Sequence, residues 1–263
     1  SLMTAMSLTG QQERAAVPEP ALTFVLVHGA FQTGDTWEPV AAELRRRGHT
    51  VHTPTLAGHG PGAALDLSHD DGVASLVGYL NEHDLTDVVL VGHSIAGSFI
   101  AKAAEQLPGA IKRLVFQNAF VPADGNPLAL EFPPEMAAMM SAIDPSQGFM
   151  LPFPLWRELA CNDIDLATVQ ELYAQMSPIP VGFMADKIDL SAFYELIGTG
   201  QIRTSYVFAV NDIVLPPGEY GWFPRMPQRL GPLCRILQTQ GGHDAKFTRP
   251  AEPAQVLVQA GRD

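Results

Sequence analysis

Short runs of apolar, mostly β-branched residues alternate along this chain with longer segments of helical periodicity. The clearest strand-like runs are at 23–27, 50–53, 87–91, 111–116, 205–210 and 235–238. Helical patterns fall between or after them, at 37–47, 69–83 and 250–260. Parallel strands need a crossover segment, usually a helix, so this alternation predicts an α/β fold with a mostly parallel central sheet flanked by helices.

The character of the chain changes twice. Residues 1–20 are small and polar and end in proline, so we expect them to form a disordered leader. Strand patterns disappear over 121–200, where prolines and most of the methionines gather and helical periodicity continues in two or three pieces. We therefore predict an α/β core from residues 21–120 and 201–263, with 121–200 as a helical lid. A methionine-rich lid can line an adaptable apolar pocket.

Composition narrows the range of partners. The net charge is −12 and no extended basic block is present, which argues against nucleic acid and favours a small-molecule substrate. No stretch approaches 18 apolar residues, and no basic segment leads into an apolar run at the start, so we expect neither a membrane span nor a signal peptide. Cys161 and Cys234 are predicted to be buried free thiols, and the expected location is cytoplasmic. A homodimer is compatible with the sequence.

The most informative local sequence surrounds Ser94. The apolar run 87–91 leads directly into GHSIAG at 92–97, and a helix of small residues follows. A serine on such a strand-to-helix turn projects its hydroxyl clear of the sheet, as a nucleophile does in the motif Gly-x-Ser-x-Gly. Gly92 fits that motif, but Ala96 stands at its last position. The structural alternative is a serine that only caps the helix.

A serine nucleophile needs a base, and the base needs an acid to orient it. In this type of fold the expected chain order is serine, acid, histidine. Asp212 comes just after the predicted strand 205–210, and His243 comes after the last predicted strand. Because the carboxyl ends of parallel strands open onto one crevice, we predict a catalytic triad of Ser94, Asp212 and His243.

Other acids fit this role less well. Asp244 is too close to His243 in the sequence to reach its ring favourably, and Asp186 and Asp189 fall in the predicted lid. Asn118 follows another predicted strand, but an amide cannot act as the acid. Asp212 is therefore the predicted acid.

Acyl transfer also needs N–H donors for the negative charge that develops on the carbonyl oxygen. The loop after the first predicted strand offers the main-chain N–H of Ala30 or Phe31, and the residue after the serine offers that of Ile95. These three residues are the predicted oxyanion hole. We expect His28 to support the loop, and His93 to point the other way along the turn in a structural role.

Several segments together resemble a known family: VLVHGA at 25–30, Trp37, GHTV at 48–51 and LAGHG at 56–60. They are similar to the α/β-hydrolase superfamily, and within it to small serine carboxylesterases of the plant methylesterase, hydroxynitrile lyase and pyrethroid hydrolase types. The resemblance covers nearly everything after about residue 22. It implies the α/β-hydrolase fold, the triad and oxyanion hole named above, and no metal or organic cofactor.

One departure from the resemblance bears on the reaction. The hydroxynitrile lyases of this group carry a lysine directly after the catalytic histidine, whereas this chain has Asp244 there and Lys246 two residues further on. The departure disfavours cyanohydrin cleavage.

The predicted function is that of a serine hydrolase that cleaves an ester of a small to medium, largely apolar substrate through an acyl-enzyme. Two alternatives stay open on the sequence alone. One is a cofactor-free lyase, thioesterase or ring-opening enzyme that uses His243 and Asp212 as its base and Ser94 for positioning. The other is a non-catalytic ligand-binding protein that has kept the pocket.

Overall fold

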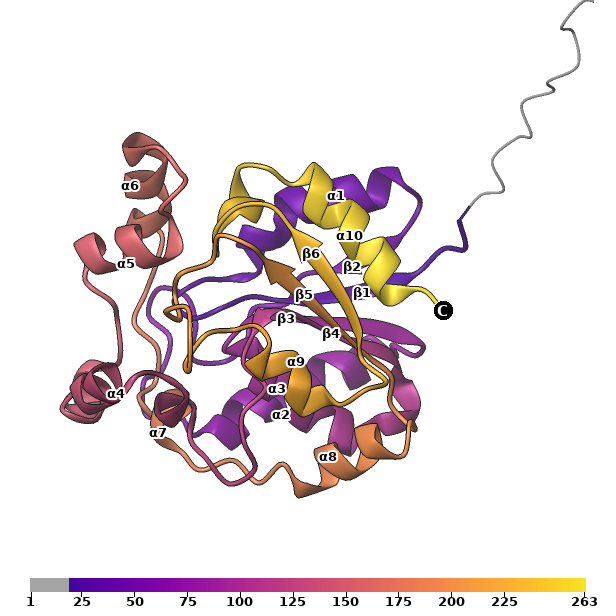
Figure 1. The fold of residues 1–263 in the computed structure, drawn as a ribbon, viewed down its shortest axis with the longest axis horizontal. Coiled ribbons are helices and arrows are strands. Elements are labelled where there is room, and N and C mark those ends of the chain that lie inside the picture. The colour runs from indigo at the N-terminus through magenta and orange to yellow at the C-terminus, as the bar shows by residue number, and fades with distance from the viewer. Residues whose placement is uncertain (1–18) are drawn as a thin grey trace, which may run out of the picture.

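The computed structural model describes residues 19–263, so the predicted leader lies outside the described residues except for Glu19 and Pro20 (Figure 1). A six-stranded parallel sheet forms the centre, in the order β2-β1-β3-β4-β5-β6. The strands are β1 (Thr23–Val27), β2 (Thr50–His52), β3 (Val88–Ser94), β4 (Ile111–Ala119), β5 (Thr204–Ala209) and β6 (Arg235–Thr239). The predicted fold class is confirmed.

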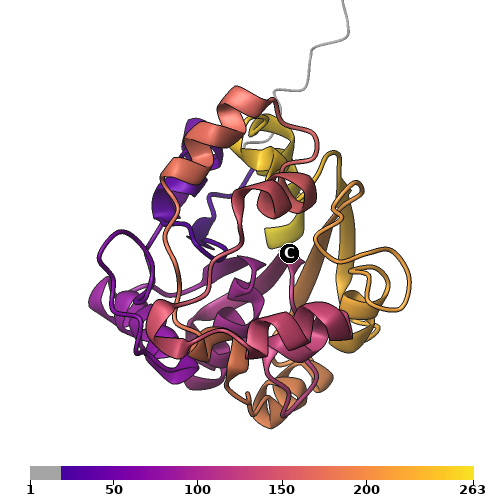
Figure 2. The same cartoon turned by 90° about the vertical axis from the view of Figure 1, so that its left-hand side faces the viewer.

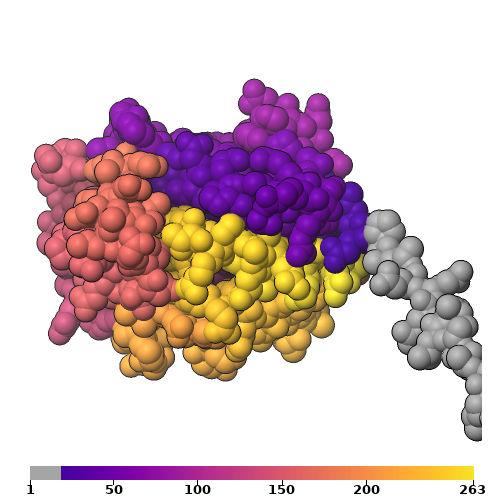
Figure 3. Space-filling model, turned by 90° about the horizontal axis from the view of Figure 1, so that it is seen from above, coloured from indigo at the N-terminus to yellow at the C-terminus, as the bar shows by residue number. Residues whose placement is uncertain are grey.

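Helices cover both faces of the sheet (Figure 1). One face carries α1 (Glu38–Arg46) and α10 (Ala251–Gly261), and the other carries α2 (His69–Glu82), α3 (Ala96–Gln106), α8 (Ser191–Gly198) and α9 (Arg225–Leu230). Seen from above in Figure 3, the indigo N-terminal part and the yellow C-terminal part adjoin on the first of these faces, where α1 packs against α10.

Strand β1 shows why an uninterrupted apolar run suits this sheet. Successive side chains of a strand point to opposite faces. Val25 and Val27 therefore pack in the layer with α2 and α3, whereas Phe24 and Leu26 pack in the layer with α1 and α10. All four side chains are fully buried, and each contributes about 1.5–3 kcal/mol relative to exposure.

The start of α2 is fixed by a reciprocal cap. The Asp71 N–H donates to the Ser68 hydroxyl at 3.1 Å, and the Ser68 N–H donates to the Asp71 carboxylate at 2.8 Å. Such a cap contributes about 1 kcal/mol because it satisfies N–H groups that the helix leaves free. The observed helix begins at His69, as predicted, and ends at Glu82, one residue before the predicted end at 83.

Two parts of the fold differ from the sequence prediction. Strand β4 continues past Phe116 to Ala119, because Gln117 pairs with Val207 of β5 and Ala119 pairs with Ser94 of β3. The segment between β4 and β5 contains five α-helices instead of two or three, namely α4 (Pro134–Ser141), α5 (Phe153–Ala160), α6 (Leu166–Ala174), α7 (Gly182–Ala185) and α8. Prolines at the starts of α4 and α5 divide that segment into short pieces.

Helices α4–α7 lie beyond the edge of the sheet toward which the strands point, and Figure 2 views the molecule from that side. Strands β1, β3, β5 and β6 end at this edge, and the loops that follow them begin there. Helices α4–α7 therefore face the loops that carry the predicted site.

Both cysteines are free, as predicted, but only Cys161 is buried. Cys234 is half-buried because it precedes β6, the edge strand of the sheet. Among residues 19–263, no helix has both the length and the apolar character that crossing a membrane requires.

Candidate active site

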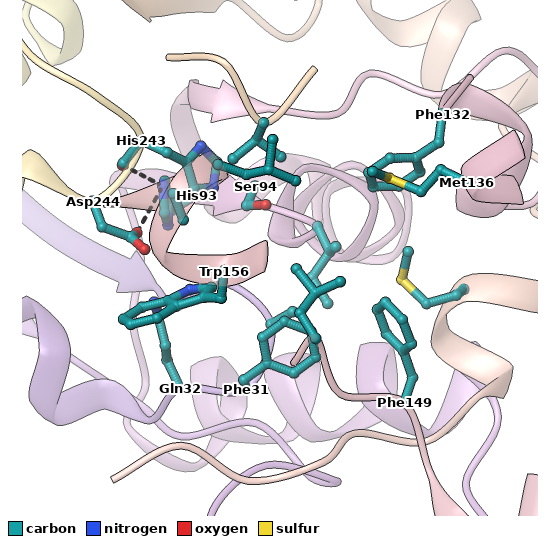
Figure 4. Close-up of a pocket in the computed structure, with 18 of the residues that line it drawn as sticks. Phe31, Gln32, His93, Ser94, Phe132, Met136, Phe149, Trp156, His243 and Asp244 are labelled. Carbon is teal, nitrogen blue, oxygen red and sulfur yellow. Dashed lines mark hydrogen bonds and ion pairs between the residues drawn. The ribbon is translucent and has the colours of Figure 1, made fainter. Parts of the chain in front are cut away.

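Ser94 is the last residue of β3, and its main chain adopts a φ of +57°. This left-handed conformation is rare for residues other than glycine and stores strain where it occurs. The Phe120 N–H donates to the Ser94 carbonyl oxygen at 3.0 Å and holds the turn against the end of β4. The side chain is 8% exposed and faces a cavity (Figure 4).

Two glycines make this turn sterically feasible. A Cβ on Gly92 would lie 2.9 Å from the carbonyl oxygen of Ala96, and a Cβ on Gly97 would lie 1.9 Å from that of Phe120. The second glycine that the turn requires is therefore Gly97, one residue later than in the usual motif. Ala96 occupies the motif's last position fully buried, while Ser94 keeps its left-handed backbone.

His243 and Asp212 come together as predicted. The distance between His243 Nδ1 and Asp212 Oδ2 is 2.5 Å, and the other carboxylate oxygen accepts the Val214 N–H at 2.9 Å. The indole of Trp222 stacks on the imidazole with 5.7 Å between ring centroids and 15° between planes. Hydrogen bonds and stacking together fix the orientation of the ring, and His243 lines the same cavity as Ser94.

The competing acids lie elsewhere. Asp244 is next to His93 and Lys246, with its Oδ1 at 3.9 Å from His93 Nε2 and 3.5 Å from Lys246 Nζ. Asp186 accepts the main-chain N–H of His69, and Asp189 accepts the N–H and hydroxyl of Ser191.

Asn118 has a structural role in this site. Its side-chain oxygen accepts the Ala209 N–H at 2.6 Å and so links the ends of β4 and β5, and its own φ is +42°. The amide thus steadies the loop that carries Asp212.

The predicted oxyanion residues Ala30, Phe31 and Ile95 all line the cavity beside Ser94. Phe31 has a φ of +72°, so the loop after β1 turns sharply at this point. Ile95 precedes the first residue of α3 and so presents its N–H at a helix N-terminus. Within residues 19–263, none of these three N–H groups donates a hydrogen bond to another protein group, which leaves them available to a ligand.

His28 supports the loop after β1, as predicted. Its Nδ1 lies 2.9 Å from the Gly29 carbonyl oxygen, and its Nε2 lies 3.1 Å from the Leu56 N–H. Burial lowers the pKa of His28 to about 4, so the ring is neutral, donates to Gly29 and accepts from Leu56. The histidine thereby ties two loops together below the cavity.

The cavity and the solvent space at its mouth together occupy about 570 Å³. Its wall is largely apolar and comes in good part from the segment between β4 and β5 (Figure 4). The large apolar side chains in that part of the wall are Phe132, Met136, Met140, Phe149, Trp156 and Met184. Three of the six methionines of this segment therefore line the cavity, whereas Met139 is largely exposed.

The prediction for His93 was incomplete. Its ring does face the side of the sheet where Trp37 packs, with 6.2 Å between ring centroids. The loop after β6 folds over the same place, so the His93 ring lies 4.4 Å from the ring of His243 and forms part of the cavity wall. Dashed lines in Figure 4 mark its contacts with the His243 main chain and with Asp244. The position of a loop 150 residues away left no signal in the local sequence.

Gln32, Trp156 and Trp222 were also missed as members of this site. The first two line the cavity, and the third stacks on His243. None of them belongs to a motif with a characteristic spacing.

One group of side chains has the spacing of metal ligands. Ligand atoms of His93, His243 and Asp244 lie within 4.8 Å of one another. The Nδ1 of His243 is already bonded to Asp212, and the Lys246 ammonium lies 3.1 Å from His93 Nδ1. A metal ion there would face that buried cation, so the residues do not fit a metal site.

Comparisons with known proteins identify the family of this chain. The sequence profile of the alpha/beta hydrolase family matches residues 24–258. A carbendazim hydrolyzing esterase from Nocardioides sp. (strain SG-4G) is 37% identical over 251 residues, which cover 90% of this chain and 99% of the esterase. Methylesterase 7 from Arabidopsis thaliana is 32% identical over 254 residues, which cover 90% of this chain and 95% of that enzyme.

A solved structure is also similar. It is that of an extracellular alpha/beta-hydrolase from a Paenibacillus species, described as sharing structural and functional homology with tobacco salicylic acid binding protein 2. The TM-score is 0.87 at 39% identity, over 92% of this chain and 100% of that one. The relatives are named as esterases and hydrolases, which supports ester hydrolysis. The predicted superfamily is confirmed, and the chain belongs to the alpha/beta hydrolase family.

Proposed function

We propose that this protein is a serine carboxylesterase with Ser94 as nucleophile, His243 as general base and acid, and Asp212 as the residue that orients His243. One observation carries the proposal: a serine with left-handed backbone and an imidazole bonded to a buried carboxylate line the same apolar cavity. A serine that only caps a helix would not need this strained backbone or a histidine–aspartate pair beside it.

In the first half of the reaction, Ser94 Oγ attacks the ester carbonyl carbon while Nε2 of His243 takes its proton. Negative charge moves onto the carbonyl oxygen, where the N–H of Ile95 and that of Ala30 or Phe31 would stabilise it. The buried Asp212 carboxylate stabilises the imidazolium that forms. Collapse of the tetrahedral intermediate breaks the ester C–O bond, and His243 returns the proton to the departing alcohol.

The second half repeats these steps with water. His243 removes a proton from a water molecule, which attacks the acyl carbon bound to Ser94. The same N–H donors hold the new oxyanion, and collapse releases the carboxylic acid and returns the proton to Ser94. No step requires a metal or an organic cofactor.

The substrate class follows from the wall of the cavity. Phenylalanine, methionine and tryptophan side chains supply most of it, so the acyl or alcohol group that enters is largely apolar. Methionines fill irregular spaces and adapt to different shapes. The names of the relatives, a carbendazim hydrolyzing esterase and a methylesterase, support testing methyl esters of flat, apolar acids first.

A substrate panel tests the proposal. The purified protein is offered p-nitrophenyl esters of increasing acyl length, methyl esters of aryl acids and the matching thioesters. We expect saturable hydrolysis of the oxygen esters, with kcat/KM higher for apolar acyl groups than for polar ones of equal size. Turnover of thioesters alone would contradict a carboxylesterase. Tight binding without any turnover would instead indicate a ligand-binding protein.

A further inference from the structure

A buried lysine lies behind the His93–His243 pair. Lys246 is 2% exposed, and its Nζ lies 3.1 Å from His93 Nδ1 and 3.4 Å from His93 Nε2. It is 3.5 Å from Asp244 Oδ1, and its ammonium faces the rings of Phe247 at 4.2 Å and Trp37 at 5.2 Å. None of the contacts of Lys246 has a role in the proposed reaction.

A charge in this place does not stabilise the fold well. Removing an ammonium from water is costly unless close hydrogen bonds replace the lost hydration, and the carboxylate at 3.5 Å is only loosely paired. Burial lowers the pKa of Lys246 to about 8, although Asp244 opposes the shift. Apolar side chains in place of both Lys246 and Asp244 would cost less free energy to bury, so stability does not account for this charged pair.

The contacts instead define the hydrogen-bonding state of His93. Burial above all, and then the charge of Lys246, lower the pKa of His93 well below its usual range, so its ring is neutral. The His243 carbonyl oxygen, 3.2 Å from Nε2, only accepts, whereas the Lys246 ammonium, 3.1 Å from Nδ1, only donates. Nδ1 therefore carries the lone pair and Nε2 carries the hydrogen. That Nε2–H donates to the carbonyl oxygen of His243 at 3.2 Å.

We propose that Lys246 and His93 are positioning residues that hold His243 from its main-chain side, while Asp212 holds it from its ring side. Lys246 donates to His93, and His93 donates to the His243 carbonyl oxygen, so the loop after β6 is fixed at the catalytic residue itself. Asp244 balances the charge of Lys246. The inference rests on the proposed role of His243 as the general base.

The geometry explains why two anchors are useful. The hydrogen bond to Asp212 and the stacking of Trp222 fix the plane of the imidazole, but neither holds its Cα at a set distance from Ser94. A histidine next to the nucleophile in sequence can do so, because His93 and Ser94 end the same strand. The chain from Lys246 through His93 thus couples the base to the turn that carries the nucleophile.

The test compares two apolar replacements with a rescue and a control. Lys246→Met removes the donor, and His93→Leu removes the link, whereas His93→Gln keeps an N–H close to the position of Nε2. Lys112→Met serves as the control, because Lys112 pairs with Asp263 on the surface away from the site. Each variant is assayed for kcat and KM on a p-nitrophenyl ester, and its free energy of unfolding is measured in urea near neutral pH.

We expect kcat to fall by about 10- to 100-fold in Lys246→Met and His93→Leu with KM nearly unchanged, because a displaced base affects the chemical step. His93→Gln should recover most of that loss. Lys246→Met should be less stable than the unchanged protein, because it leaves the buried Asp244 carboxylate without its cation. A kcat within twofold of the unchanged protein in both apolar variants would overturn the proposal. So would a loss of kcat in His93→Leu that His93→Gln does not recover.

A spectroscopic measurement tests the hydrogen-bond chain independently of activity. The ¹⁵N chemical shifts of the His93 ring distinguish the two neutral tautomers. The expected result is a single Nε2–H form in the unchanged protein and a mixture in Lys246→Met. An Nδ1–H form in the unchanged protein would contradict the chain even if every kinetic result agreed. If no ester is turned over, the proposed function fails, whereas this measurement still tests the contacts of Lys246.

Discussion

His243 Nδ1 and Asp212 Oδ2 lie 2.5 Å apart, although 31 positions separate the two residues in the chain. The Asp212 side chain is fully buried, and its second oxygen is held by the Val214 N–H. Hydrogen bonds to a carboxylate are short and strong, particularly away from water. The histidine–aspartate pair is therefore formed before any substrate binds. The Nε2 of His243 remains as the nitrogen that exchanges protons in the proposed reaction.

Asp212→Asn should lower kcat by about 10⁴-fold with little change in KM, because an asparagine amide favours the wrong imidazole tautomer and cannot stabilise the imidazolium. Steady-state kinetics on a p-nitrophenyl ester measure both constants. Asp189→Asn is the matched control, since Asp189 is an exposed acid whose partners within residues 19–263 are Ser191 and, at its main-chain carbonyl, Lys102. An Asp212→Asn variant with a tenth of the original kcat would exclude Asp212 as the orienting acid.

Two glycines in helices are expected to respond oppositely to alanine. At Gly97, a Cβ would lie 1.9 Å from the Phe120 carbonyl oxygen, so the end of β4 must shift away from α3. We expect Gly97→Ala to lower the free energy of unfolding by about 1–3 kcal/mol. Ester hydrolysis should fall as well, because Phe120 also holds the Ser94 turn.

Gly78 is the control for this substitution. It is exposed in α2, and a Cβ there meets nothing within 4 Å. Gly78→Ala should raise the free energy of unfolding by about 0.5–1 kcal/mol, because alanine loses less backbone entropy than glycine on folding. Urea denaturation of both variants decides the matter. Equal effects of the two substitutions would show that the contact at Gly97 is not restrictive.

Adjacent methionines on α4 separate a wall residue from a surface residue. Met140 lines the cavity and is 4% exposed, whereas Met139 is 48% exposed. Met140→Ala enlarges the cavity, so kcat/KM for bulky acyl esters should rise relative to that for acetate, while Met139→Ala should leave the ratio unchanged. Kinetics across an acyl series measure the ratio. The same selectivity in both variants would place the acyl group elsewhere.

Buried neutral histidines should make the protein sensitive to acid. Burial lowers the pKa of His69 to about 4, and its Nε2 lies 2.8 Å from the Ser98 hydroxyl. Between about pH 6.5 and pH 4 the unfolded chain binds the proton that the folded chain excludes. The contribution of His69 is thus fully present above pH 6.5 and is lost as the pH falls, by about 3 kcal/mol at most.

Urea denaturation at several pH values measures this linkage. The free energy of unfolding should decrease from pH 6.5 to pH 4, and less steeply in His69→Gln, which has no titrating group at that position. His28 is expected to contribute in the same direction, since burial lowers its pKa to about 4 as well. An unfolding free energy that stays constant or rises on acidification over this range would contradict the assignment of neutral buried histidines.

The sequence was sufficient to predict the sheet and the loops that carry the site. Uninterrupted apolar runs such as 23–27 mark strands buried on both faces, and parallel strands bring their carboxyl ends to one edge. Ser94, Asp212 and His243 could therefore be placed together from chain order alone. Ala30, Phe31 and Ile95 followed from the same reasoning, and the structure places all of them around one cavity except Asp212, which lies behind His243.

What the sequence did not reveal depends on contacts between distant segments. His93 and Lys246 belong to no local pattern, and their proximity depends on how the loop after β6 folds over the end of β3. The wall of the cavity was equally unpredictable, because short helices broken by prolines show weak periodicity. Trp156 therefore looked like any other aromatic residue until the arrangement of α5 was known.

The most direct test of the central claim is covalent labelling of the nucleophile. The protein is treated with a fluorophosphonate, and the adduct is located by mass spectrometry of proteolytic peptides. The control is Ser98→Ala, because Ser98 is a buried serine in the first turn of α3 that does not line the cavity. We predict one adduct, on Ser94, in the unchanged protein and in Ser98→Ala, and neither adduct nor ester hydrolysis in Ser94→Ala. Full ester hydrolysis by Ser94→Ala, or an adduct on another residue, would contradict the acyl-enzyme mechanism.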